Sequence, residues 1–189
     1  MRLPPFPPDA LDPELRGVHD TIVELMVRRQ PEIVAQDDDG ALIGPFPAML
    51  RFPSFGIPAL RLLAAVGTEA RLPAHVRETA ILTVGGHFNA RYELYAHEIM
   101  GEVAGLTAAQ IATLASGGRP PDLSDEDAIT HDLSRALVSG HSLPASTYER
   151  ARDLLGVDGV GELVFLIGAY CLIAIALNCF DMPVPEPAG

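Results

Sequence analysis

Apolar residues along most of this chain recur every three or four positions, the period of an amphipathic α-helix. Asp12 followed by Pro13 has the form of an N-cap and a first helical turn, and apolar side chains then continue at helical spacing to Gln30. Ile57 to Val66 predicts a short helix that stops at Gly67. Convincing strands are hard to find. The pattern therefore predicts an all-α fold.

The second half of the chain continues the helical pattern. Pro73 opens a helix that we expect to end at Gly85-Gly86, and a link around Phe88 leads to a helix from about Ala90 to Ala104. Glycine- and proline-rich loops separate the helices that follow. These later helices are predicted at Thr107 to Leu114, Ser124 to about Ser139, Pro144 to Gly156, and about Gly159 to Asn178.

Composition narrows the classes of function. The chain has 189 residues, a length that suits one domain, and 48% of them are hydrophobic, enough for a folded core. Its 13 basic and 25 acidic side chains give a net charge of −12. Nucleic acids and anionic membrane surfaces are recognised by clustered Lys and Arg. The charge therefore argues against both as partners.

The sequence predicts a cytoplasmic protein. The segment Met1 to Asp9 has no basic and then apolar stretch, so it does not resemble a signal peptide. The strongest apolar run, Leu163 to Leu177, is shorter than the roughly 20 residues of a membrane-spanning helix. We expect this run to be a buried core helix. The two cysteines of the chain cannot build a multi-disulfide framework.

The densest group of ionisable and aromatic side chains lies between Arg77 and Glu102. Glu93 and His97 are four residues apart and share one face of their helix. If this helix packs antiparallel to the preceding one, the rise of about 1.5 Å per residue places Glu78 at nearly the depth of His97. Two carboxylates and an imidazole would then converge. Such a set suits proton transfer, because burial and mutual proximity move their pKa values toward neutrality.

Two other interpretations of this group stay open. Glu93 and His97 also form an i,i+4 pair that any solvated helix can carry. A metal site would use them with Glu78 or His87, but no second ligand motif such as His-Glu-x-x-His accompanies them. The prediction is a site with no metal and no cofactor.

The remaining cysteines and histidines predict no second site. Cys171 and Cys179 are eight residues apart on one helix, about 12 Å along its axis, which is too far for a disulfide. We expect both to be small core residues. His75 falls in the first turn of its helix, and His19, His131 and His141 are predicted to lie at the surface.

Two segments, RETAIL (Arg77 to Leu82) and NARYELYAH (Asn89 to His97), resemble the core helical hairpin of the carboxymuconolactone decarboxylase family, which includes the alkyl-hydroperoxidase-like (AhpD-like) proteins. The resemblance continues in AGLT (Ala104 to Thr107), DGALIGPF (Asp39 to Phe46), ELVFLIGAY (Glu162 to Tyr170) and LNCFDMPVP (Leu177 to Pro185). It implies an AhpD-like helical domain over residues 37–185, preceded by an arm and first helix at 1–36 and followed by a tail at 186–189. It also implies a homo-oligomer, a trimer or hexamer.

One departure from the family pattern decides what the resemblance implies about activity. The peroxidase members have a Glu, then Cys-x-x-Cys, then a His four residues on. Glu78 and His97 match the outer positions, whereas Ala90 and Glu93 occupy the cysteine positions. A peroxidase needs a reactive thiolate and a resolving thiol. The resemblance therefore implies the thiol-free, decarboxylase-like branch.

The implied enzyme is a cofactor-free decarboxylase of a small carboxylated lactone or enol-like acid. His97 would donate the proton. Glu93 would orient the imidazole of His97 or shuttle protons, and Glu78 would tune His97. Substrate binding would involve Arg77 or Arg91, which could hold a carboxylate, and Tyr92 or Tyr95. Local arginines would be needed because the net charge of −12 repels an anionic substrate at long range. The alternative is a non-catalytic binding or assembly protein that retains the fold.

Overall fold

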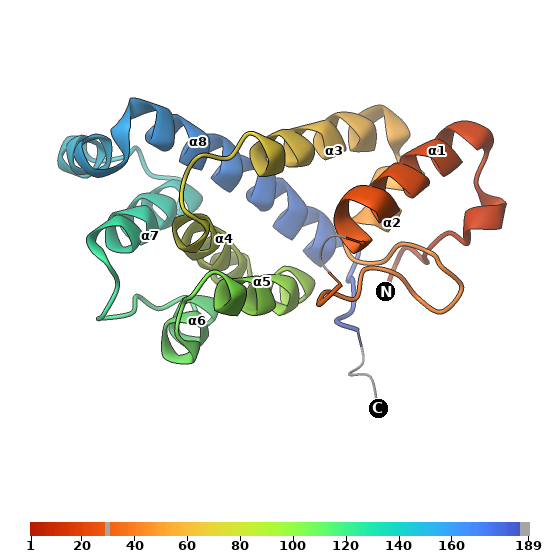
Figure 1. The fold of residues 1–189 in the computed structure, drawn as a ribbon, viewed down its shortest axis with the longest axis horizontal. Coiled ribbons are helices and arrows are strands. Elements are labelled where there is room, and N and C mark those ends of the chain that lie inside the picture. Colours follow the sequence, from red (N-terminus) through yellow and green to blue (C-terminus); the bar gives the residue numbers. More distant parts are fainter. Residues whose placement is uncertain (29–30, 186–189) are drawn as a thin grey trace.

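The computed structural model describes residues 1–28 and 31–185, and the regular elements within these ranges are helices (Figure 1). A 3-10 turn at Pro8–Ala10 and a π-helical turn at Val23–Val27 flank the first helix. The all-α prediction is confirmed. The α-helices are α1 (Pro13–Ile22), α2 (Phe46–Arg51), α3 (Pro53–Thr68), α4 (Ala74–Phe88), α5 (Arg91–Val103), α6 (Ala108–Ala115), α7 (Asp125–Val138) and α8 (Ala145–Cys179).

Several predicted helix starts are confirmed by their caps. Asp12 accepts a hydrogen bond from the backbone N–H of Leu15, and Ser124 accepts one from that of Asp127. Thr107 and Gln110 form a reciprocal capping box at the start of α6. The predicted end of the first helix at Gln30 and the predicted tail at 186–189 lie outside the described residues.

Helix α4 is at the centre of the molecule and packs against α5, α6, α7 and α8. Every residue from Glu78 to Gly85 is buried. A helix that is covered on all sides has no solvated face, and this explains why its apolar residues follow no clear stripe. The same position carries the carboxyl group of Glu78 into the interior.

The predicted end of this helix at Gly85-Gly86 is wrong, because α4 continues to Phe88. A Cβ atom on Gly86 would lie 2.4 Å from the carbonyl oxygen of Leu114, so the glycine lets α6 pack closely against α4. The helix ends instead at Asn89, which has a positive φ of 50°. Close packing and helix termination both select small residues, and the sequence pattern does not separate them.

The region between Gly44 and Gly67 forms two helices where one was predicted. Helix α2 is only six residues long and was missed because it is too short for a periodic pattern. Helix α3 begins at Pro53, four residues before the predicted start at Ile57. Pro58 lies inside α3 and obscures it, because proline more commonly marks a helix start.

The predicted break at Gly156 is confirmed as a kink. Gly156 has φ 73° and ψ 168°, and it divides α8 into a shorter and a longer helical part. In Figure 1 the longer part runs between α3 and the α4–α5 pair. By length and composition α8 as a whole could cross a membrane, and 44% of its most apolar 18-residue stretch is buried inside the protein.

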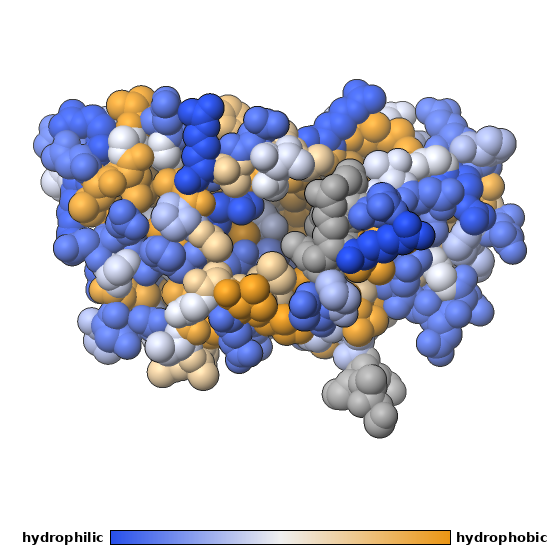
Figure 2. All heavy atoms as spheres, viewed as in Figure 1, coloured by the Kyte–Doolittle hydropathy of each residue, from blue (hydrophilic) through white to orange (hydrophobic). Residues whose placement is uncertain are grey.

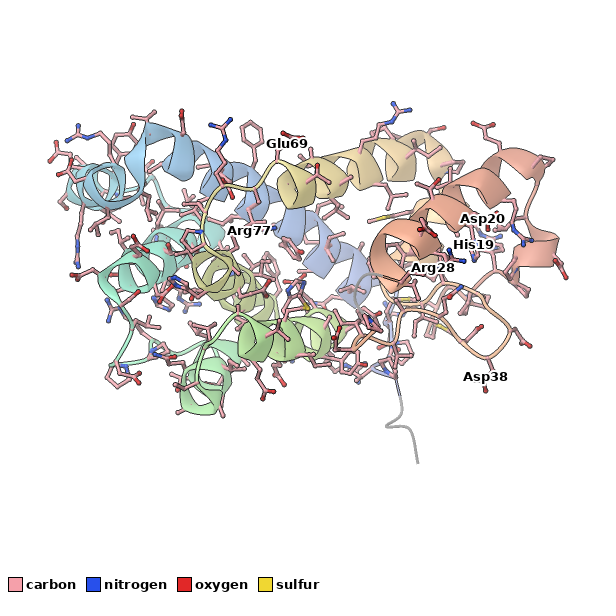
Figure 3. The ribbon with its side chains drawn as sticks, viewed as in Figure 1. His19, Asp20, Arg28, Asp38, Glu69 and Arg77 are labelled. Carbon is pink, nitrogen blue, oxygen red and sulfur yellow. The ribbon has the colours of Figure 1, made fainter. Side chains whose placement is uncertain are left out.

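Two histidines predicted at the surface are buried. His19 is 3% exposed and joins α1 to the turn at residues 37–40, with Nε2 3.0 Å from the Gly40 carbonyl oxygen and Nδ1 2.9 Å from Asp20 (Figure 3). His131 is 5% exposed, with Nδ1 3.2 Å from Asp132. Both surface predictions are wrong, because the segments that cover these two histidines are distant from them in the sequence. The surface prediction for His141 is confirmed.

The two cysteines differ from each other. Both are free thiols. Cys171 is half-buried and packs against the core, close to its prediction. Cys179 is exposed, so its prediction as a core residue is wrong. It is the last residue of α8.

The N-terminal segments share a core with the rest of the chain. One hydrophobic cluster joins Ile22 of α1 and Leu50 of α2 to Tyr92 of α5 and Leu177 of α8. On the outside, Figure 2 shows the surface hollowed between the part around α1 and the part around α4 and α5.

Candidate functional site

The α4–α5 pair brings Glu78 and His97 into contact. The turn between the two helices is tight, with the backbone N–H of Ala90 bonded to the carbonyl oxygen of Gly85. The helices then run antiparallel, and Oε2 of Glu78 lies 2.8 Å from Nδ1 of His97. A carboxylate accepts a hydrogen bond, so Nδ1 carries the proton. This bond orients the imidazole and leaves Nε2 as its other reactive nitrogen.

The pair is close to the surface but largely enclosed. The side chains of His97 and Glu78 are 15% and 11% exposed. Tyr170 of α8 packs against the imidazole, with the two ring centroids 4.9 Å apart and the ring planes at 87°. This edge-to-face contact is a favourable geometry for two aromatic rings. His97 is therefore held by a hydrogen bond from one helix and by a ring from another.

Glu93 is the most deeply buried acidic residue near the pair. It is 2% exposed, and neither of its carboxyl oxygens has a hydrogen-bond partner among the described residues. A Cβ atom on Gly85 would lie 3.3 Å from Oε1 of Glu93, so the glycine makes room for this carboxyl group. Burial raises the pKa of Glu93 well above its usual value. Burial thus favours the protonated, neutral form of the Glu93 carboxyl group over the carboxylate.

Arg77 lies near the start of α4, beneath the connection from α3 (Figure 3). Its Nη2 donates a hydrogen bond to the carbonyl oxygen of Val66 at 3.1 Å, and its Nε lies 4.0 Å from a carboxylate oxygen of Glu162. Glu162 itself accepts hydrogen bonds from the backbone N–H groups of Arg71 and Leu72. The Nε of Arg77 is buried and has no hydrogen-bond partner within the described ranges. Arg77 thus keeps unused donor capacity.

Arg91 lies apart from the Glu78–His97 pair. It is 61% exposed and bonds Asp181 at 3.1 Å. Together they line a surface cavity of about 260 Å³ at the α4–α5 turn, with Asn89 and Asn178. Of the two arginines named as substrate-binding candidates, Arg77 is the one whose charge acts on Tyr170.

Tyr92 and Tyr95 use their hydroxyl groups to hold the N-terminal segment. The Tyr92 hydroxyl donates to the carbonyl oxygen of Val34 at 2.9 Å, and the Tyr95 hydroxyl accepts from the N–H of Val34 at 3.2 Å. Burial also raises the pKa of Tyr92. These contacts give both residues a structural role.

Tyr170 and Glu162 are parts of this region that were not recognised as site residues. Both lie on α8, in a segment whose apolar character indicates core packing. Their spacing of eight residues puts them on a similar side of the helix, and this was the available signal. Nothing in the local pattern, however, relates that side of α8 to the α4–α5 pair.

The positions that carry thiols in the peroxidase pattern are occupied by other groups. Ala90 is fully buried at the N-terminus of α5, and Glu93 follows in the first turn. Cys171 is the nearer free thiol, and both burial and Glu93 raise its pKa. A raised pKa disfavours the thiolate, which is the reactive form of cysteine. Within the described ranges, no group of three or more His, Cys, Asp or Glu side chains has the geometry of a metal site.

Comparisons with known proteins support the fold. No family model and no curated protein matches this sequence. The structure is similar to the crystal structure of an alkylhydroperoxidase AhpD core, an uncharacterized peroxidase-related protein from Ralstonia eutropha JMP134, with a TM-score of 0.72 over 98% of this chain and 92% of that chain. The two sequences are 14% identical, so the likeness concerns the fold alone. The chain has an all-α, AhpD-like fold.

Proposed function

We propose that this protein is a cofactor-free, decarboxylase-like enzyme that acts on a small carboxylated lactone or enol-like acid in the cytoplasm. The observation that carries the proposal is the 2.8 Å bond between Glu78 and Nδ1 of His97, beside a buried carboxyl group that has no partner. An oriented imidazole can donate a proton, and a buried acid whose pKa is raised can hold one in reserve. Aromatic catabolism is a setting in which such substrates arise.

The proposed reaction needs only groups of this chain. When the carbon–carbon bond to the carboxylate breaks, its electron pair stays on the substrate as an enolate or dienolate, and CO2 leaves. His97, protonated on both nitrogens, gives the Nε2 proton to the substrate carbon and becomes neutral. Glu93 lies about one helical turn, roughly 6 Å, from His97 along α5, and it can return a proton to the imidazole through water. Solvent then reprotonates Glu93 and supplies the one proton that each turnover consumes. Arg77 would bind the substrate carboxylate through its guanidinium group.

Turnover of carboxymuconolactone tests this function. We expect the purified protein to release CO2 and to change the ultraviolet absorbance of the substrate. His97→Ala and Glu93→Ala should each lower the rate by a factor of roughly 10² to 10⁴, the usual contribution of general acid–base catalysis. His75→Ala, which removes the histidine of another carboxylate pair, is the matched control and should leave the rate unchanged. Full activity in both site variants would refute these roles, and an inactive wild type would refute the substrate.

A second candidate, a non-catalytic binding or assembly protein, is favoured by the exposed side of α8. Five large apolar residues lie there at helical spacing, 45–65% exposed: Val157, Val164, Phe165, Leu172 and Ile175. Gly161 and Gly168 lie between them and leave room for large side chains of a second copy. We propose that this face joins copies of the chain in a trimer or hexamer. A monomer in sedimentation would contradict the assembly.

The two candidates differ in how His97 responds to a ligand. In a working site, the imidazole resonances of His97 should shift when a substrate-like carboxylic acid is added, because Nε2 faces the ligand. In a purely structural network, they should not respond. Phe165→Asp offers a separate test of the assembly, since a charge on the exposed face should dissociate the oligomer without altering those resonances.

A further inference from the structure

Tyr170 meets the Glu78–His97 pair from a third helix. Its ring packs at 87° to the imidazole, with the ring centroids 4.9 Å apart. Because Glu78 already holds Nδ1, the tyrosine ring restricts the remaining rotation of His97. The ring contact alone would make Tyr170 a positioning residue.

The hydroxyl group of Tyr170 points to an additional role. None of the described residues forms a hydrogen bond with it, although the charges of nearby groups act on it. Burial, Glu78 and Glu93 raise the pKa of Tyr170, and Arg77 opposes them. The raised pKa favours the protonated form of the hydroxyl, which can act as a hydrogen-bond donor.

The other tyrosines do not offer such a donor. The hydroxyl groups of Tyr92 and Tyr95 are engaged with the backbone of Val34. Tyr148 is 40% exposed on the outer part of α8. Tyr170 is thus the tyrosine that combines contact with His97 and a hydroxyl free for a ligand.

We propose that Tyr170 is a ligand-binding residue of this site, whose hydroxyl donates a hydrogen bond to the anionic oxygen of a planar, conjugated ligand while its ring holds His97. The proposal rests on the proposed function, since an enolate oxygen is the group that such a donor stabilises. Arg77 would share the charge of the same ligand. The site should therefore be specific: conjugated oxyanions should bind, and saturated carboxylic acids of similar size should bind less well.

Binding of 4-nitrophenolate, a coloured oxyanion, tests the role of the hydroxyl without requiring turnover. We expect wild-type protein to bind it with a change in its visible absorbance, and Tyr170→Phe to bind it about tenfold more weakly, the loss of one hydrogen bond to a charged group. Tyr148→Phe, on the same helix, is the matched control and should bind like the wild type. Cyclohexanecarboxylate should compete poorly.

The ring is tested separately through His97. Nitrogen NMR of the imidazole should show the same Nδ1-protonated form in wild type and Tyr170→Phe, since phenylalanine keeps the ring. In Tyr170→Leu, the imidazole of His97 should no longer be uniformly in the Nδ1-protonated form. Conversely, unchanged binding in Tyr170→Phe, or no binding by the wild type, would overturn the proposal. The protein could instead bind nitrophenolate through Tyr170 and have no decarboxylase activity. That result would support the role of Tyr170 and refute only the proposed function.

Discussion

Helix α4 contributes to two carboxylate–histidine pairs that look alike in distance and differ in their surroundings. Near its start, Nδ1 of His75 lies 2.7 Å from Asp127, and one turn later Glu78 lies 2.8 Å from Nδ1 of His97. Asp127 has further partners: Ser124 Oγ donates to it at 2.6 Å and Thr79 Oγ1 at 3.4 Å. Glu78 has His97 as its side-chain partner among the described residues, with the unpartnered Glu93 nearby.

The contrast separates a structural pair from a candidate site. The acceptor positions of Asp127 are filled by groups at the starts of α4 and α7, where a carboxylate is also favoured by the helix dipoles. Such a group joins two helices and has little freedom to exchange protons. Around Glu78 and His97, the Glu93 carboxyl group, the Tyr170 hydroxyl and the Nε of Arg77 have no hydrogen-bond partner among the described residues. Unused hydrogen-bonding capacity costs stability, and retaining it is typical of functional sites.

The largest effect on stability should come from Asp127. Asp127→Ala removes an acceptor from His75, Ser124 and Thr79, and it takes its acceptor from the buried Thr79 hydroxyl and the half-buried imidazole of His75. We expect the free energy of unfolding to fall by about 3 kcal/mol. Urea denaturation measures it. Asp125→Ala, in the same first turn but 80% exposed, is the control and should cost little. An equal loss of unfolding free energy in Asp127→Ala and Asp125→Ala would contradict a structural role for the His75–Asp127 pair.

The next effect is the pH dependence that Glu93 contributes. Its pKa is raised in the folded protein above the ordinary value of 4.5, so the folded state holds the proton more tightly than the unfolded state. Stability should therefore fall as the pH rises above 4.5, by up to about 1.4 kcal/mol per pH unit, until Glu93 ionises. Glu93→Gln should remove this slope, and the exposed Glu98→Gln should keep it. Parallel wild-type and Glu93→Gln curves of stability against pH would show that Glu93 is not a buried acid.

A smaller effect on stability, with a clear local signal, is expected for Glu78. Glu78→Ala removes one partner of a partly exposed histidine, so unfolding should become easier by about 1 kcal/mol. The Nδ1 proton of His97 should then exchange with water about tenfold faster, because its hydrogen bond is lost. Proton-exchange NMR of the imidazole measures this rate, and the corresponding proton of His75 should be unaffected. Slow exchange at His97 in this variant would mean that another group holds the ring.

The smallest effect should come from Thr79. Its hydrogen bond to Asp127 is long, 3.4 Å, so Thr79→Val should change the unfolding free energy by about 0.5 kcal/mol or less. Ser124→Ala should cost about 1 kcal/mol, since Ser124 is also the N-cap of α7. Chemical denaturation of the two variants gives the ranking. A larger loss for Thr79→Val would indicate that the buried threonine, rather than the cap, secures Asp127.

Helical periodicity, capping residues and the helical rise were sufficient to predict most of the helices and the contact between Glu78 and His97. These two residues are 19 apart, on helices joined by a short turn, so the helical rise alone sets their relative depth. The same reasoning predicted the capped starts of α1, α6 and α7. It failed at Gly86, because the sequence does not show that a neighbouring backbone, rather than a helix end, requires the glycine.

The sequence by itself determined the helical class, the tight α4–α5 pair and the lack of a Cys-x-x-Cys motif in that pair, since each depends on residues close together in the chain. The tertiary structure alone decided that His19 and His131 are buried, that Asp127 is bonded to His75 across 52 residues, and that Tyr170 packs against His97. Those contacts depend on which side of one helix meets another. Packing of the whole core selects that side, and no periodicity within a single helix records it.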